Sequence, residues 1–147
     1  KGYIVVGQDT DGTVTPLDLN LNWMIGKNKN DFIGKRSLSR SDIIKSDRKQ
    51  LVGLVPIDKT YGIEEGQHVI EEENLNTPIK KPVKMLGQVT SSYFSPTLNH
   101  SVAMALIKGG NRKIGSHLFV STSNLNTIAV EVVKPNFIDS ENQRLKL

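Results

Sequence analysis

The second half of the chain is a series of short apolar segments, each bounded by Gly, Pro or Asn. Val, Ile, Leu and Thr dominate these segments, and this composition between turn formers is typical of β-strands. Strands spaced roughly every ten to fifteen residues predict a small closed barrel or a sandwich, in which closure removes exposed edges. The predicted strands are residues 51–57, 67–71, 84–92, 101–107, 117–121 and 127–133.

The segment at 101–107 differs from the others because it is apolar on both faces. Alternate side chains of a strand point to opposite faces. One face carries Val102, Met104 and Leu106, and the other carries Ala103, Ala105 and Ile107. A strand with this pattern is buried on both sides, so we expect it at the centre of the sheet.

The first part of the chain has a less regular pattern. Residues 3–6 predict a short buried strand, followed by a turn-rich loop at 7–12. Thr15 followed by Pro16 and Asp18 has the form of a helix start, with Thr as the N-cap and Asp placed to accept backbone donors. Alternating apolar residues at 17–23 favour an extended chain instead, so we expect a short helical turn that leads into a strand.

Two further elements are expected before the strand-rich half. Residues 37–44 predict a short helix, and the charged run at 45–49 predicts a linker. The polar tract Glu71–Asn76 predicts a solvated hairpin loop.

Length and composition limit the possible classes of protein. A chain of 147 residues forms one ordinary domain, or a small domain plus a fragment of another. It begins at Lys1 without Met and continues directly into an apolar stretch, so we interpret it as a fragment of a longer polypeptide.

Cysteine is absent, which excludes disulfides within the segment and fits a reducing, cytoplasmic compartment. No apolar run approaches the roughly 20 residues that span a bilayer, so a soluble protein without membrane contact is expected.

The net charge of +4 is modest. Small barrels also serve as nucleic-acid or protein-docking modules, and Lys80, Lys81, Arg112 and Lys113 lie near turns where they could meet phosphates. The aromatic residues are few and are not grouped into a stacking platform. We therefore expect no nucleic-acid partner, while a non-catalytic barrel module for docking or nucleic-acid binding stays open as an alternative.

Several residue patterns resemble part of a metal-binding or catalytic motif, but each lacks residues that the motif requires. Asp9-Thr10-Asp11-Gly12 resembles the start of a calcium loop, but Val14 and Asn20 occupy the positions of its required Gly and Glu. The three histidines lack metal-ligand spacing, and Thr90-Ser91-Ser92 lacks the glycine pattern of a nucleophile. The sequence therefore predicts neither a metal site nor a catalytic residue in this chain.

Two side chains are candidates for ligand contact. Trp23 is the only tryptophan, and its ring could stack on a heteroaromatic ligand or anchor packing between the first segment and the barrel. Arg144 lies in the terminal tail, where it could point into water or bind a carboxylate.

Ordered motifs over nearly the whole chain resemble the glycine-cleavage T-protein (aminomethyltransferase) family. The motifs are Gly7–Asp11, Val14–Asp18, Leu21-Asn22-Trp23, Asp31–Leu38, Val52-Gly53-Leu54, Glu65-Gly66, Gly87–Ser91, Ser95–Leu98, Ile114-Gly115 and Phe137-Ile138-Asp139. Within that family, the run Met85–Leu98 followed by Lys108-Gly109-Gly110 is most similar to the alpha-subunit branch of heterotetrameric sarcosine oxidases. A free-standing glycine-cleavage aminomethyltransferase is the near alternative.

The resemblance implies a mainly β fold with two parts. Residues 1–45 would be the tail end of an α+β folate-binding domain, and residues 46–147 would form a six-stranded Greek-key β-barrel of the aminomethyltransferase C-terminal type. It also implies tetrahydrofolate as the ligand, with Trp23 near the pterin and Arg144 at a folate contact. Relatives can use a tyrosine before the first-motif glycine at the ligand, where this chain has Val6.

The resemblance further implies an enzyme in which this chain is only one part. In the sarcosine oxidase branch, a flavin oxidises sarcosine to an imine and the folate-binding domain captures the one-carbon unit as methylene-tetrahydrofolate. FMN, FAD and NAD would be bound elsewhere in a complex with beta, gamma and delta subunits. The family's catalytic residues match no motif here and would lie upstream of Lys1, so we expect the chain to be inactive alone.

Overall fold

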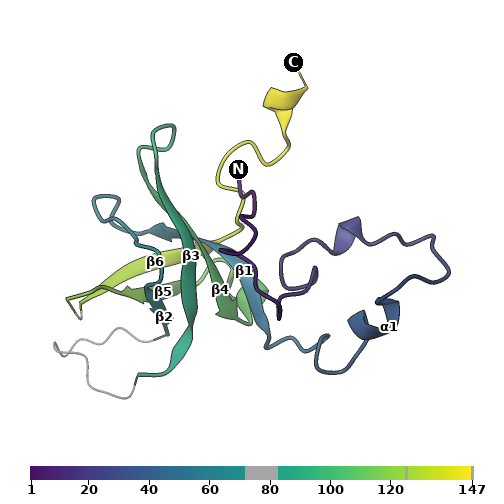
Figure 1. The fold of residues 1–147 in the computed structure, drawn as a ribbon. Coiled ribbons are helices and arrows are strands. Elements are labelled where there is room, and N and C mark those ends of the chain that lie inside the picture. The colour runs from purple at the N-terminus through teal and green to yellow at the C-terminus, as the bar shows by residue number, and fades with distance from the viewer. Residues whose placement is uncertain (72–82, 125, 147) are drawn as a thin grey trace.

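Six antiparallel strands close into a barrel in the computed structural model, which describes residues 1–71, 83–124 and 126–146 (Figure 1). The strands are β1 (Lys49–Pro56), β2 (His68–Ile70), β3 (Met85–Ser95), β4 (His100–Lys108), β5 (His117–Ser121) and β6 (Thr127–Val133). Their order around the barrel is β1-β4-β3-β2-β5-β6, and β1 pairs with β6 to close it. Every predicted strand of the second half is therefore present within a few residues of its expected bounds.

The strand order is that of a Greek key. β2, β3 and β4 are neighbours in sequence and in the barrel, whereas β1 lies beside β4. β4 is the most extensively paired strand, with Lys49 to Leu54 of β1 on one side and Gly87 to Ser95 of β3 on the other. The predicted mainly β barrel is thus confirmed.

The two apolar faces of β4 pack against different parts of the molecule. Ala103, Ala105 and Ile107 face the barrel interior, where they join a core of aliphatic side chains from all six strands. Met104 and Leu106 face outward and form a second cluster with Leu51 of β1. This outer cluster is covered by Ile4, Val14, Leu19 and Phe137. The first segment of the chain and the residues after β6 therefore supply the cover that the pattern of β4 requires.

The expected strand at residues 3–6 is wrong. The segment is irregular and leads into a turn, and Tyr3, Val5 and Val6 are 68%, 44% and 87% exposed. Only Ile4 packs on the barrel, against the outer cluster. No strand of the described residues pairs with this segment, and without a partner its β-branched residues do not form a strand.

The strand expected near residue 23 is also absent, and a 3-10 turn, η1 (Asn22–Met24), takes its place. The helix expected at 37–44 is shorter and starts earlier, as α1 (Lys35–Leu38), with turns after it. Two more 3-10 turns are η2 (Gly110–Lys113) and η3 (Gln143–Leu145). The predicted hairpin loop at 71–76 lies almost wholly outside the described residues.

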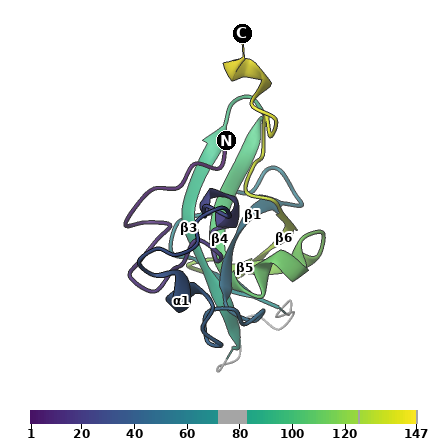
Figure 2. The same cartoon turned by 90° about the vertical axis from the view of Figure 1, so that its right-hand side faces the viewer.

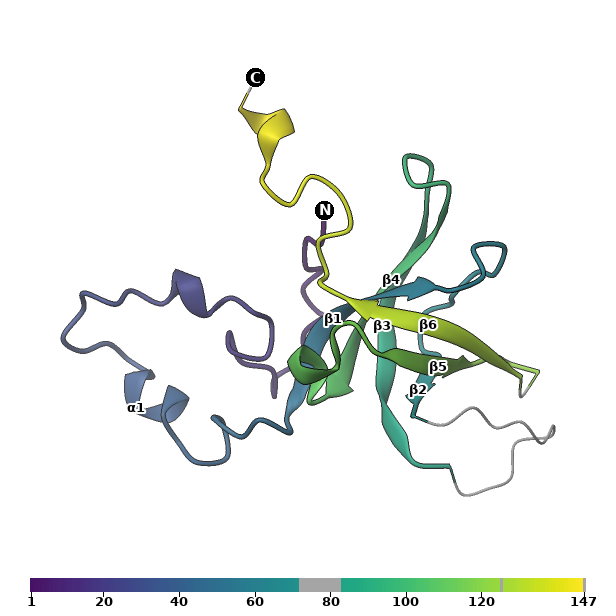
Figure 3. The ribbon, with the colours of Figure 1, turned by 180° about the vertical axis from the view of Figure 1, so that it is seen from behind.

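Residues 22–45, which we call the arm, extend away from the barrel and carry α1 (Figures 1 and 3). No hydrogen bond or ion pair among the described residues joins the arm to a strand. The first and last segments instead lie side by side, since Lys1 forms an ion pair with Asp139 (Figure 2). Within the described residues, none of the helices has the length and apolar character that crossing a membrane requires.

Candidate functional site

Trp23 lies on η1 at the base of the arm, and its side chain is 71% exposed. The alternative role, an anchor between the first segment and the barrel, does not fit this exposure. The covering contacts on the barrel come from Val14 and Leu19 instead. The indole is therefore accessible to a flat ligand or to another polypeptide.

Arg144 lies on η3, at the end of the C-terminal tail, and is exposed. The start of this turn is held by Asp139, whose carboxylate accepts from the Gln143 amide at 2.7 Å and the Arg144 amide at 3.3 Å. The hydrogen bond from Lys1 to the Asp139 carboxylate is the main cause that holds the pKa of Asp139 below its usual value. Arg144 is thus carried by a tail tied to the first residue of the chain, and no ion pair within the described chain engages its guanidinium.

The two candidates are not brought together. The turn η3 stands beyond the end of the barrel, while η1 lies beside it, and the three views agree on this separation (Figures 1, 2 and 3). If both contact one ligand, they contact its opposite ends.

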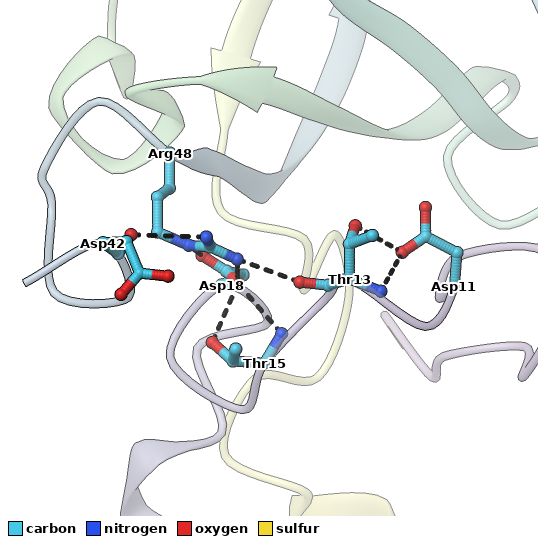
Figure 4. A network of polar contacts seen from close by, with 6 residues as sticks. All are labelled: Asp11, Thr13, Thr15, Asp18, Asp42 and Arg48. Atoms are coloured by element: carbon cyan, nitrogen blue, oxygen red, sulfur yellow. Dashed lines mark hydrogen bonds and ion pairs between the residues drawn. The ribbon is translucent and has the colours of Figure 1, made fainter. Parts of the chain in front are cut away.

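The most developed polar site joins the two ends of the arm, where Arg48, which follows the arm, binds Asp18, which precedes it (Figure 4). Arg48 donates from Nε to Asp18 Oδ1 at 2.9 Å and from Nη2 to Asp18 Oδ2 at 2.7 Å. The same guanidinium donates to the Thr13 carbonyl at 3.0 Å. The Asp18 side chain is 3% exposed and that of Arg48 is 23% exposed, so this bidentate pair is largely withdrawn from water.

The local sequence completes this site. The Thr15 amide and hydroxyl donate to Asp18 Oδ2 at 2.9 and 2.8 Å, as the helix-start pattern predicted for Asp18. Burial raises the pKa of Asp18, but the hydrogen bonds from Arg48 and Thr15 outweigh it and the net pKa is lowered. The Asp18 hydrogen bond raises the pKa of Arg48. Both groups are thus held in their charged forms.

A second buried carboxylate, that of Asp9 in the first segment, packs against β3. Its side chain is fully buried, and its Oδ1 accepts from Thr90 Oγ1 at 2.5 Å and Ser91 Oγ at 2.7 Å. Its Oδ2 accepts from the Val5 amide at 2.8 Å. Three donors therefore hold the buried carboxylate, and no cation contacts it among the described residues.

The incomplete calcium-loop pattern that starts at Asp9 and the serine-rich pattern Thr90-Ser91-Ser92 thus contact each other. Asp9 and Asp11 do not converge on a cation, since Asp9 binds the hydroxyls of β3 while Asp11 accepts from the Thr13 amide at 2.7 Å. The described residues hold no group of His, Asp and Glu that could bind a metal ion. Thr90 and Ser91 serve as donors to Asp9, a role that sequence reasoning missed. Asp9 and Ser91 are 82 residues apart, and nothing in the sequence around either residue indicates that they contact each other.

The arm carries the chain's entire net positive charge. Residues 22–45 contain six Lys and Arg and two Asp, so the arm has a net charge of +4 and the rest of the chain is neutral. Apolar side chains are exposed on the same arm, namely Trp23 (71%), Met24 (63%), Ile33 (105%) and Ile44 (61%). A groove of about 380 Å³ is lined by residues that include Leu17, Ile25, Phe32, Leu38, Lys27 and Lys29. This combination is typical of a surface that another polypeptide covers.

Comparison with known proteins identifies the family to which this chain belongs. Residues 49–139, which include the whole barrel, match the glycine cleavage T-protein C-terminal barrel domain. The chain belongs to the glycine cleavage T-protein family. Within this family it is similar to the sarcosine oxidase subunit alpha of Corynebacterium sp. (strain P-1), with 47% identity over 80% of this chain and 12% of that protein. The corresponding subunit of Rhizobium meliloti (strain 1021) is 33% identical over 99% of this chain and 14% of its own length.

Free-standing members of the family are also similar. The aminomethyltransferase of Nitrosomonas europaea is 36% identical over 93% of this chain and 34% of its own length. The structure of glycine cleavage system aminomethyltransferase T from Bartonella henselae superimposes with a TM-score of 0.72 over 94% of this chain and 36% of that one, at 24% identity. This structural likeness supports the fold. The chain therefore spans about a third of the length of the aminomethyltransferase relative and about an eighth of the Corynebacterium subunit.

Proposed function

We propose that this chain is the carboxy-terminal part of a sarcosine oxidase alpha subunit, in which it helps to bind tetrahydrofolate. The observation that carries the proposal is the 47% identity with the Corynebacterium subunit, which exceeds the 36% identity with the Nitrosomonas aminomethyltransferase. A free-standing aminomethyltransferase is the second candidate, favoured by a match that extends over 93% of the chain.

The chain divides in this proposal into two units. Residues 1–45 are the end of a folate-binding domain, and residues 46–147 are the barrel that supports it. The placement of Trp23 and the arm outside the barrel supports this division, as does the family match that starts at residue 49. The catalytic groups lie on other parts of the longer polypeptide, so residues 1–147 are inactive alone.

Trp23 and Arg144 are the proposed contacts to tetrahydrofolate. An exposed indole suits stacking on the pterin, and a guanidinium suits the carboxylates of the glutamate end. The pterin and the glutamate are opposite ends of an elongated molecule, so the separation of η1 and η3 is compatible with one ligand. Both side chains are exposed and neither is engaged in an ion pair of the described residues, so they fit the chemistry of this group.

The chemistry that bound tetrahydrofolate would supply is uptake of the one-carbon unit of the imine formed from sarcosine, which would give methylene-tetrahydrofolate and leave glycine. Capturing a reactive imine depends on proximity and exclusion of water. The contribution of this chain is to orient the ligand through Trp23 and Arg144 and to close one side of its site. FMN, FAD and NAD are bound by other parts of the cytoplasmic complex.

The arm is the proposed contact between this chain and the rest of the complex, which includes the beta, gamma and delta subunits. Its charge of +4 and its exposed apolar side chains suit an acidic and apolar surface. Charge complementarity of this kind makes association dependent on salt.

The proposal is tested by measuring the ratio of methylene-tetrahydrofolate to free formaldehyde that is formed by the assembled oxidase that contains this chain. Trp23→Ala is expected to divert product from methylene-tetrahydrofolate to free formaldehyde, while the rate of flavin reduction by sarcosine stays unchanged. The control is Tyr61→Ala, since Tyr61 is also an exposed aromatic residue, at 54%, but lies between β1 and β2 and not on the arm. An unchanged product ratio for Trp23→Ala would remove Trp23 from the site.

A further inference from the structure

The strand β3 contains a bulge at the point where Asp9 binds. Val89 pairs with Ala105 and Ser91 pairs with Met104, so Thr90 is an extra residue that is paired with no residue of β4 in the register. Consecutive side chains of a regular strand point to opposite faces, but a bulge can turn them to the same side. Here the hydroxyls of both Thr90 and Ser91 reach the same oxygen of Asp9.

The residue before Asp9 completes this arrangement. Gln8 Nε2 donates to the Thr90 carbonyl at 3.0 Å and to Glu65 Oε1 at 2.7 Å. The bulge therefore presents two donors and one acceptor, and Gln8 and Asp9 satisfy all three. The two hydroxyls share Asp9 Oδ1, and the Val5 amide donates to Oδ2 at 2.8 Å. A carboxylate offers two accepting oxygens, whereas a side-chain amide offers one, so these three donors together select Asp at position 9.

The first segment is attached to the barrel a second time at Asp18, nine residues after Asp9. Asp18 is held by Arg48, and the Leu51 amide of β1 donates to the Asp18 carbonyl at 2.7 Å. Asn20 Nδ2 donates to the Leu51 carbonyl at 2.9 Å. Between the two carboxylates, Val14 packs on the outer cluster of the barrel. Residues 9–20 thus form a strap across the barrel, attached at both ends, and Trp23 follows directly after it.

We propose that Asp9 and Asp18 are positioning residues, which fix the strap on the barrel and so set the orientation of Trp23. The part that concerns folate rests on the proposed function, whereas the attachment of the strap does not. The bulge of β3 is then a receptor for the Asp9 carboxylate. Neither residue contacts the ligand, and both act on it through Trp23.

The test compares Asp9→Asn, Asp18→Asn and the double variant in residues 1–147 by hydrogen exchange and Trp23 fluorescence anisotropy. In the double variant, we expect the amides of Asp9, Asp18 and Leu21 to exchange at rates on the order of those of an unstructured peptide. The amides of β6 stay protected, and the anisotropy of Trp23 falls. Asp11→Asn is the matched control because the Asp11 side chain is exposed in the same loop and accepts from the neighbouring Thr13 rather than from the barrel.

Ligand binding gives a second measure. The dissociation constant for tetrahydrofolate is expected to rise about tenfold in the double variant. Equal loss of protection in the strap and β6 would contradict the proposal, as would a strap that stays protected or an unchanged Trp23 anisotropy. If the unsubstituted chain binds no tetrahydrofolate while the strap behaves as expected, the folate role fails and the attachment stands.

Discussion

Arg48 and Asp18, which are 30 residues apart in the sequence, form a bidentate ion pair that joins the first segment of the chain to the start of β1. Both contacts are short, at 2.9 and 2.7 Å, and Asp18 is almost fully buried. Such a pair stabilises weakly in net terms, but removal of one partner leaves a buried charge without compensation. This asymmetry makes the pair the most sensitive point of the strap.

Arg48→Met is expected to lower the free energy of unfolding by about 3 kcal/mol, because it leaves the Asp18 carboxylate buried without its cation. Urea unfolding at pH 7 measures this change. The matched control is Lys108→Met, which removes an exposed partner of Asp47 at 3.5 Å and should cost less than about 1 kcal/mol. Equal losses of unfolding free energy in the two variants would contradict the expectation that burial makes the Asp18 pair more sensitive to removal of its cation.

The Asp18 pair also makes stability depend on pH. The pKa of Asp18 is lower in the folded chain than in the unfolded chain, so its contribution is fully present above the unfolded pKa, which is about 4. That contribution is lost as the pH falls through the folded pKa. Asp18→Asn should therefore destabilise the chain at pH 7, and its deficit relative to the unsubstituted chain should shrink toward pH 3. A deficit of the same size at both pH values would contradict the assignment.

Gly87 permits the close approach of β3 and β4. A Cβ built at this position would lie 1.9 Å from the Leu106 carbonyl oxygen, so Gly87→Ala forces the two backbones apart. We expect a loss of about 3 kcal/mol or more, at the upper end for overpacked cores, as measured by thermal unfolding. Gly62→Ala is the control, because nothing lies within 4 Å of a Cβ there. Equal melting temperatures for the two variants would contradict this explanation.

The barrel was predictable because its signal is local. Each strand is marked by its own run of aliphatic residues, and the two apolar faces of β4 indicated that something covers the barrel from outside. The covering residues could not be identified in advance, since Ile4, Val14 and Leu19 lie in a segment without regular structure. Residues 3–6 have strand propensity, but no strand among the described residues pairs with them, and such pairing depends on the tertiary structure rather than on local sequence.

The candidate site was predictable in part. Trp23 and Arg144 were selected as single side chains, and their exposure leaves their role in folate binding a prediction. The attachments of Asp9 and Asp18 depend on contacts across 82 and 30 residues, which no spacing rule contains. The helix-start pattern did identify Asp18 as an acceptor for Thr15, because that contact is local.

Titration of tetrahydrofolate into residues 1–147, followed by Trp23 fluorescence, tests the central claim most directly. Because this is the only tryptophan, the signal reports one position. The account predicts saturable quenching, with weaker binding in an Arg144→Ala variant that is detected through the same indole. Binding of tetrahydrofolate by the longer polypeptide, with no change in Trp23 fluorescence in residues 1–147, would contradict it and would place the folate site on other residues.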